Sequence, residues 1–127
     1  MLDHVSLGVS DLERSRRFYD ATLAPLGLVR IADFEGRGSD YGSMAAPWGG
    51  EFTVTRERGV APTPGAHVCV RAASREAVDR FYAAGLAAGG RCDGAPGLRE
   101  YHAGYYAAFL LDPDGHHVEA ACMIPGP

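Results

Sequence analysis

The stretch HVSLGVSDLERSRRFYDATLAPLGL, residues 4–28, recurs as HVCVRAASREAVDRFYAAGLAAGGR, residues 67–91. The two stretches align without a gap, and 10 of their 25 positions are identical. His4 falls opposite His67, and an Arg-Phe-Tyr run recurs at one place in both copies. A repeated unit that cannot close its own core must bury its apolar face against its copy. The sequence therefore predicts two related modules, each with one histidine near the seam between them.

The composition is that of one globular domain. The chain has 127 residues, of which 46% are hydrophobic and 22% are charged, and this is enough for a real core. The net charge is −4, whereas nucleic-acid-binding proteins usually carry an excess of basic residues, so the composition disfavours that role. All 12 basic residues are arginine, so Schiff-base chemistry through a lysine of this chain is excluded.

The cysteines and the apolar segments indicate a cytoplasmic protein. There are three cysteines, an odd number, and they lack metal-ligand spacing, which argues against a disulfide scaffold and fits a reducing compartment. No segment approaches the ~20 apolar residues of a membrane span. The N-terminus reads directly as a strand, so we expect no signal peptide, and neither a membrane nor a nucleic acid as partner.

The first copy and the segment after it predict one module over residues 1–58. Alternating apolar residues predict a strand over 2–9, and Ser10 with Glu13 forms a capping-box pair that begins a helix through about Leu23. The apolar stripe of this helix leaves three arginines away from the core, at Arg14, Arg16 and Arg17. Three further strands are expected at 28–34, 39–45 and 52–56.

The second copy repeats this order in a module over residues 66–127, after a linker at 59–65. We expect a strand at 66–72, a helix at 74–87, a long loop at 94–104, and strands at 105–111 and 117–123. The last two strands flank a tight turn at 112–115. Each half is strand–helix–strand–strand–strand, although the middle strand of the second half is poorly defined. An unrelated ferredoxin-like α+β domain is the alternative, but the three-strand tail of the repeat disfavours it.

Strand alternation places three metal-type ligands on one face. Val118 and Ala120 should face the helix, which puts Glu119 on the opposite, open face of the sheet. The same rule puts His4 and His67 on that face. Two imidazoles and one carboxylate directed into one concavity suit Fe(II), Mn(II) or a similar ion, with positions left open for substrate.

The duplication predicts a fourth position on the first module. Thr53 aligns with Glu119, and Glu51 lies one pleat earlier on the same face. Threonine is a poor metal ligand, so either Glu51 supplies a carboxylate through a strand shift or water fills the place. The sequence leaves these alternatives open.

Several other side chains are candidates for substrate binding or proton transfer. The polar aromatic cluster after the long loop is either a packed loop or a wall that stacks on substrate and transfers protons, and its members are Tyr101, His102, Tyr105 and Tyr106. Cys69 and Arg71 share the open face with His67; we expect Cys69 to line the pocket, and Arg71 either to hold an anionic group of the substrate or to reach solvent. Trp48 is expected in the core or the pocket wall. His116 is expected in a solvated hairpin, and His117 either there or at the mouth of the pocket.

Taken together, these motifs resemble the vicinal oxygen chelate superfamily. The resemblance spans the chain and rests on Asp3-His4-Val5, the helix start at residues 11–15 with Phe18-Tyr19, His67, and the turn at 112–115 with Glu119. The superfamily includes glyoxalase I, extradiol dioxygenases, and the fosfomycin- and bleomycin-resistance proteins. The resemblance implies an α+β fold of paired βαβββ modules whose curled sheets enclose a site, often completed by a homodimer. It also implies metal ligands at His4, His67 and Glu119.

Two functions follow from the resemblance. The first is a divalent-metal-dependent enzyme, a lyase or dioxygenase-like protein, that uses Fe, Mn, Ni or Zn to bind two adjacent oxygens of a small substrate. In it, His102 or a tyrosine such as Tyr101 or Tyr105 would transfer the proton. The second is a non-catalytic binder of small molecules or drugs. The departure at Thr53 disfavours glyoxalase I itself, where this strand carries a Glu or Gln ligand.

Overall fold

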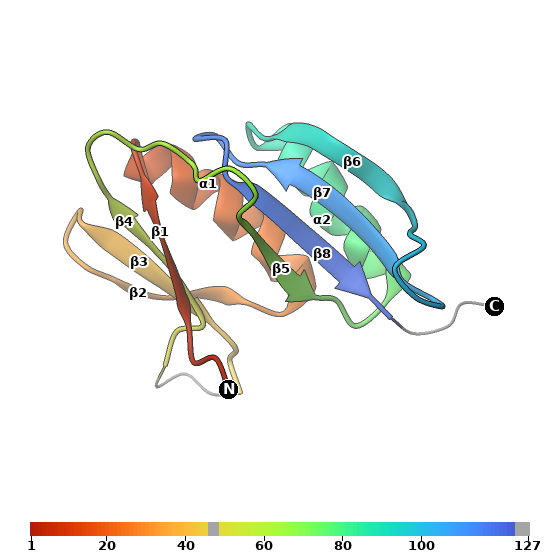
Figure 1. The fold of residues 1–127 in the computed structure, drawn as a ribbon. Helices are drawn as coiled ribbons and strands as arrows, with labels where there is room; N and C mark the ends of the chain where they lie inside the picture. Colours follow the sequence, from red (N-terminus) through yellow and green to blue (C-terminus); the bar gives the residue numbers. More distant parts are fainter. Residues whose placement is uncertain (46–48, 124–127) are drawn as a thin grey trace.

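The computed structural model describes residues 1–45 and 49–123 of the chain. Two four-stranded sheets and two α-helices make up this part (Figure 1). In chain order the elements are β1 (Val5–Val9), α1 (Leu12–Leu23), the 3-10 helix η1 (Ala24–Leu26), β2 (Val29–Asp33), β3 (Gly38–Gly42), β4 (Phe52–Arg56), β5 (His67–Arg71), α2 (Arg75–Ala87), β6 (Arg91–Leu98), β7 (Tyr106–Leu111) and β8 (His117–Cys122).

The two sheets have the same topology. The strand order is β1-β4-β3-β2 in the first and β5-β8-β7-β6 in the second. In each sheet the first and last strands of the module pair in parallel, and the remaining pairs are antiparallel. The fold class expected from the sequence, two βαβββ modules in an α+β protein, is therefore confirmed.

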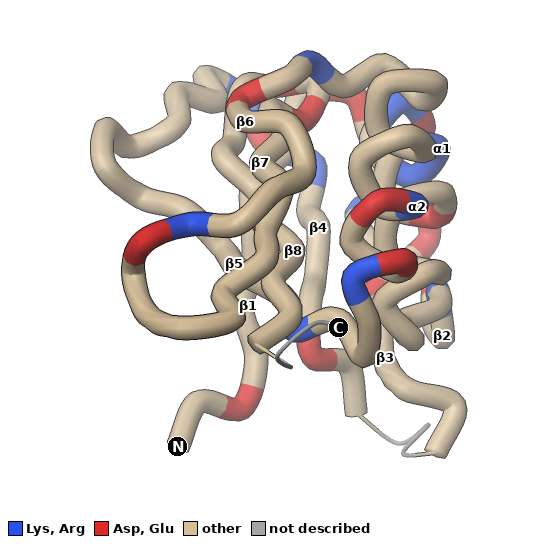
Figure 2. The backbone as a smooth tube through the Cα atoms, turned by 90° about the vertical axis from the view of Figure 1, so that its right-hand side faces the viewer, with Lys and Arg blue, Asp and Glu red and all other residues tan. Residues whose placement is uncertain are grey.

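Both helices cover one side of the two sheets and pack against each other (Figures 1 and 2). Their apolar stripes close a common core with the sheets, in which Phe18 and Phe81, an aligned pair of the duplication, are fully buried. Gly85 permits the close approach of α2, because a Cβ at this position would lie 2.2 Å from Leu110 Cδ1 of β7. The described part of the chain has no helix long and apolar enough to span a membrane.

The first helix begins differently from the sequence expectation. Asp11, not Ser10, is the N-cap residue of α1, and its side chain accepts a hydrogen bond from the Arg14 backbone N–H. Ser10 instead contacts Asp114 of the second module, since its backbone N–H and its hydroxyl both donate to that carboxylate. The expected Ser10–Glu13 capping box was wrong, because a long-range partner outcompetes the local one.

The prediction of a long loop at 94–104 is also wrong for the first half of that segment. β6 runs through this region to Leu98 and pairs with β7, with register shifts between Cys92 and Gly94 and between Gly94 and Gly97. Bulges let a strand rich in glycine keep its pairing while its alternation is broken. The glycines and the proline of this segment therefore suggested a loop, although its backbone stays paired in the sheet.

The turn between β7 and β8 fastens the second module to the first. Asp112 is completely buried, and its Oδ2 accepts a 2.6 Å hydrogen bond from the Tyr19 hydroxyl of α1. Its Oδ1 accepts from two backbone N–H groups of its own turn. His116 is not in a solvated hairpin as expected, because its Nε2 contacts the Gly8 carbonyl of β1 at 2.7 Å. The turn is thus both locally closed and bonded across the seam.

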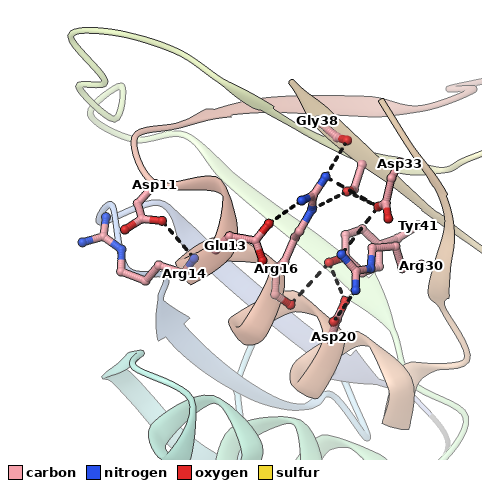
Figure 3. Close-up of polar contacts among 10 residues, drawn as sticks. Asp11, Glu13, Arg14, Arg16, Asp20, Arg30, Asp33, Gly38 and Tyr41 are labelled. Carbon is pink, nitrogen blue, oxygen red and sulfur yellow. Dashed lines mark hydrogen bonds and ion pairs between the residues drawn. The ribbon is translucent and has the colours of Figure 1, made fainter. Parts of the chain in front are cut away.

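Arg16 is another departure from the sequence expectation, since it is buried instead of lying on the outer face of α1. Its Nε donates to Ser39 Oγ at 2.8 Å and its Nη2 to the Gly38 carbonyl at 3.1 Å (Figure 3). The carboxylates of Glu13 and Asp33 balance its charge. The guanidinium therefore joins α1 to the β2–β3 hairpin of the first module.

Replacing Tyr19 by Phe should lower the free energy of unfolding by about 1.5–3 kcal/mol, because the buried Asp112 carboxylate loses a donor. Burial, together with Asp112, raises the pKa of Tyr19. The protonated Tyr19 therefore contributes fully to the free energy of unfolding below the pKa of an unfolded tyrosine, about 10, and this contribution declines as the pH rises above that value. Urea unfolding at pH 8 and pH 10.5 should show a smaller pH effect in the variant. Tyr82→Phe, at the matching position of α2, should lower the free energy of unfolding by less. An equal decrease in both variants would contradict the role of Tyr19 as a donor to Asp112.

Replacing Arg16 by Leu should lower the free energy of unfolding by about 1–3 kcal/mol, since Ser39 and Gly38 lose hydrogen bonds in a buried setting. The neighbouring exposed residue offers a matched control, and Arg17→Leu should change stability by less than about 0.5 kcal/mol. Chemical denaturation of both variants measures the difference. Equal effects would mean that Arg16 stabilises the protein only through general charge.

Candidate functional site

The site candidates of the second module lie on the side of its sheet away from the helices. His67 pairs with His117, Cys69 with Glu119, and Arg71 with Ala121 across the parallel β5–β8 ladder. Paired residues project from the same face of a sheet. The placement of His67 and Glu119 on one open face, expected from alternation, is therefore what the structure shows.

Glu119 is the centre of this face. It is only 2% exposed, although it points away from the core. The Tyr105 hydroxyl donates to its Oε2 at 2.6 Å, and His67 Nε2 lies 3.1 Å from its Oε1. A buried carboxylate is costly unless each oxygen is engaged. The sequence predicted the direction of Glu119 but not its burial, which Tyr105 and His67 create by covering it.

Cys69 lies beside this carboxylate on the neighbouring strand. Cys69 is exposed as a residue, but partial desolvation of its thiol and the negative charge of Glu119 raise its pKa to about 12. A thiol in this state is a poor nucleophile. Cys69 lines a hollow together with Arg71, and its role toward a substrate stays a prediction.

Tyr105 is held by the segment that joins β6 to β7, which stands out on the side of the sheets opposite the helices (Figure 2). The rings of Tyr101 and His102 both meet the Tyr105 ring edge-on, with centroids 5.0 Å away. Burial and the hydrogen bond to Glu119 raise the pKa of Tyr105, so its phenol stays protonated. The structure thus brings together the three residues expected to transfer protons.

Tyr106 lies apart from this aromatic cluster. Its hydroxyl donates to Asp79 of α2 at 2.6 Å, and the Arg75 guanidinium lies 5.2 Å from its ring centroid. Adjacent residues of a strand face opposite sides of the sheet, so Tyr106 is on the helix side. The expected substrate contact of Tyr106 is therefore not supported by its position.

His4 is not brought together with His67 and Glu119 within the chain. It precedes β1, is exposed, and its Nδ1 lies 2.7 Å from Asp3 Oδ1. With Glu51, Cys69 and Arg71 it lines a hollow of about 310 Å³. Over residues 1–45 and 49–123, no three His, Cys, Asp or Glu side chains lie close enough to hold one metal ion. Trp48, the other expected pocket residue, is outside the described residues.

The first module carries a carboxylate that sequence reasoning missed. Thr53, the aligned counterpart of Glu119, donates through its hydroxyl to Asp40 Oδ1 at 2.5 Å. Asp40 pairs with Thr53 from the neighbouring strand β3, so both side chains project from one face. The acidic group of this module thus lies one strand away from the position that the duplication predicts. Only the β3–β4 register could have revealed it.

His117 points toward β6. Its Nδ1 lies 2.7 Å from Asp93 Oδ2, in the bulged part of that strand. The imidazole therefore has a carboxylate partner of its own, and it borders a small hollow that His67 also lines. Whether His117 lies at the mouth of a substrate pocket stays a prediction.

His67 and Glu119 fit two positions of a metal ligand set. Two donor atoms that occupy adjacent positions around one small octahedral ion, each about 2.1 Å from it, are about 3 Å apart. The measured separation of His67 Nε2 and Glu119 Oε1 is 3.1 Å. A neutral imidazole and a carboxylate are also the donor types that Fe, Mn and Zn accept.

Comparison with known proteins identifies the family. The family model for the glyoxalase/bleomycin resistance protein/dioxygenase superfamily matches residues 1–120. The chain belongs to this superfamily, as the resemblance of its motifs indicated.

Solved structures of similar proteins have the same fold. A glyoxalase/bleomycin resistance protein from Albidiferax ferrireducens is 36% identical, with a TM-score of 0.79 over 94% of this chain and 95% of that one. A glyoxalase-related enzyme from Fulvimarina pelagi is 21% identical, with a TM-score of 0.73 over 96% and 87%. The genomically encoded fosfomycin resistance protein FosX from Listeria monocytogenes is 16% identical, with a TM-score of 0.70 over 96% and 92%. None of the curated proteins compared matches significantly.

The raised pKa of Cys69 predicts slow reaction with thiol reagents. At pH 8 a thiol with a pKa of about 12 is a thiolate in about one molecule in ten thousand. In a Cys92→Ser background, where Cys122 is buried, stopped-flow labelling should report a rate far below that of a free thiol. Glu119→Gln should raise the rate several-fold, because it removes a negative charge that raises the pKa. Glu51→Gln is the control and should have no effect; rapid labelling of the Cys92→Ser protein would contradict the assignment.

Proposed function

We propose that the chain is a divalent-metal-dependent enzyme of this superfamily, a lyase or dioxygenase-like protein acting on a small molecule with adjacent oxygens. The observation that carries the proposal is the buried Glu119 carboxylate, whose Oε1 lies 3.1 Å from His67 Nε2 on an open face. The enzyme is cytoplasmic, and neither a nucleic acid nor a membrane is its partner. The metal is Fe, Mn, Ni or Zn.

A second copy of the chain completes the ligand set. His67 and Glu119 supply two donors, and His4 is a third metal-type donor that is exposed and apart from them. In a two-fold homodimer the same patch of both chains forms the interface, so each contact between two residues occurs twice, with the chains exchanged. His4 of one copy, with Glu51 nearby, then serves the His67–Glu119 pair of its partner, and two equivalent sites form.

The residues around the proposed metal site would orient the ligands and line the place where the substrate binds. A divalent metal bound there would act as a Lewis acid on the substrate oxygens. Tyr105 keeps its proton at neutral pH and donates a hydrogen bond to Glu119, so it orients that carboxylate. The edge-on rings of Tyr101 and His102 hold the Tyr105 ring in place. Cys69 and Arg71 line the adjoining hollow, and Trp48 remains a predicted part of the wall.

A non-catalytic small-molecule binder is the second candidate. It is favoured by the aromatic cluster, in which Tyr101 is 66% exposed and offers a stacking surface without any metal. Such a protein would be stabilised by its ligand equally well in the presence and absence of a chelator. The two functions therefore differ in one measurable property, the dependence on metal.

Metal binding tests the proposal directly. Titration of the chelator-treated protein with Mn²⁺, Fe²⁺, Ni²⁺ and Zn²⁺ should show one ion per chain for at least one metal. His67→Ala should weaken binding at least about tenfold, because a first-sphere donor is lost, whereas His102→Ala should leave it unchanged. If the intact protein binds none of the four metals, the second candidate function replaces the first.

Mixing two inactive variants tests the shared site. His4→Ala and His67→Ala proteins should each bind metal weakly, but a heterodimer of the two has one site that keeps both histidines. After unfolding and refolding together, equal amounts should recover about a quarter of the sites, because half of the dimers are mixed and each restores one of two sites. Recovery of none would place the whole ligand set within a single chain.

A further inference from the structure

We propose that Arg99 binds an anionic group of the substrate, so that the preferred substrates carry a carboxylate or a similar oxyanion beside the two adjacent oxygens. This inference rests on the proposed function and adds the substrate class. It concerns a residue at the end of β6, in the same segment that supplies the aromatic cluster.

The guanidinium of Arg99 is held against the open face of the second sheet. It lies 5.4 Å from the ring centroid of Phe109 on β7, within the range of a cation–π contact. Its Nη2 donates to the Ala95 carbonyl at 2.7 Å. An arginine with two such restraints loses less side-chain entropy when it binds a ligand.

Two glycines of β6 make room for this position. A Cβ at Gly97 would lie 3.2 Å from Arg99 Nη1, and one at Gly94 would lie 3.3 Å from Nη2 and 3.0 Å from the Phe109 ring. The guanidinium therefore lies close to the β6 backbone, in space that side chains at Gly94 and Gly97 would crowd. The same glycines cause the register shifts in this strand.

Arg99 is also adjacent to the proposed metal site. Phe109 pairs with Glu119 across the β7–β8 ladder, so the ring under the guanidinium neighbours the buried carboxylate on the same face. The Arg99 backbone N–H donates to the Tyr105 carbonyl at 2.8 Å. One strand separates the cation from the metal ligand.

The charge of Arg99 is left for a ligand. Among the described residues, no Asp or Glu oxygen lies within 4 Å of its guanidinium. Within residues 1–45 and 49–123, the Ala95 carbonyl is the one hydrogen-bond acceptor of its five N–H donors. Guanidinium groups bind planar oxyanions through paired hydrogen bonds. A guanidinium held in this way near the His67–Glu119 pair would bind an anionic substituent of a substrate that chelates the metal.

A matched pair of probes tests the inference. Catechol and 3,4-dihydroxybenzoate offer the same two adjacent oxygens, and only the second adds a carboxylate. Calorimetry with the Zn²⁺-loaded protein should show that 3,4-dihydroxybenzoate binds at least about tenfold more tightly. Arg99→Gln should remove this preference and leave catechol binding unchanged. Arg80→Gln, a loss of the same charge on the exposed side of α2, should preserve it.

The outcomes separate this inference from the proposed function. If Zn²⁺ binds but Arg99→Gln weakens both probes equally or neither, or if neither probe binds, the role of Arg99 is overturned while the metal site stands. If Zn²⁺ does not bind, the proposed function fails, and benzoate is titrated into the metal-free protein while the Arg99 Nε–Hε signal is followed by NMR. A saturable shift, absent with benzyl alcohol, would support the anion site, and no shift would overturn it.

Discussion

Burial of the Asp112 carboxylate at the seam constrains how the two modules meet. A fully buried carboxylate must be satisfied on both oxygens, and here one oxygen is bonded by its own turn and the other by Tyr19 of the first module. Ser10 and Gly8 of the first module bond to the same turn through Asp114 and His116. The helices can pack in a common layer because this turn holds the sheets at one relative position.

The same physical rule shapes the open face. Glu119 points away from the core, yet it is buried, because Tyr105, just before β7, donates to one of its oxygens and His67 of β5 contacts the other. The negative charge is thus kept in a sheltered place beside a protonated phenol. Such an arrangement is expensive for a protein that needs only a folded sheet, which is why it supports a functional reading of this face.

The two modules share one architecture but differ in their polar side chains. Phe18 and Phe81 fill equivalent places in one core, whereas the Tyr19 hydroxyl donates across the seam to Asp112 and Tyr82 lies beside Cys92 of its own module. On the open faces, Glu119 has no carboxylate counterpart at Thr53, and Asp40 occupies the neighbouring strand instead. Core positions must keep their volume in both copies, but polar surface positions are free to diverge once each module has its own role.

The sequence by itself determined the two-module architecture, the helix and most strand positions, and the side of the sheet on which His67 and Glu119 lie. These follow from periodicity, which is a local property of the chain. Only the tertiary structure decided that Ser10 bonds to Asp114, that Arg16 is buried, that β6 continues through its glycines, and that Arg99 lies over Phe109. Each of these depends on a partner distant in sequence or on a bulge that breaks alternation, and periodicity carries no information about either.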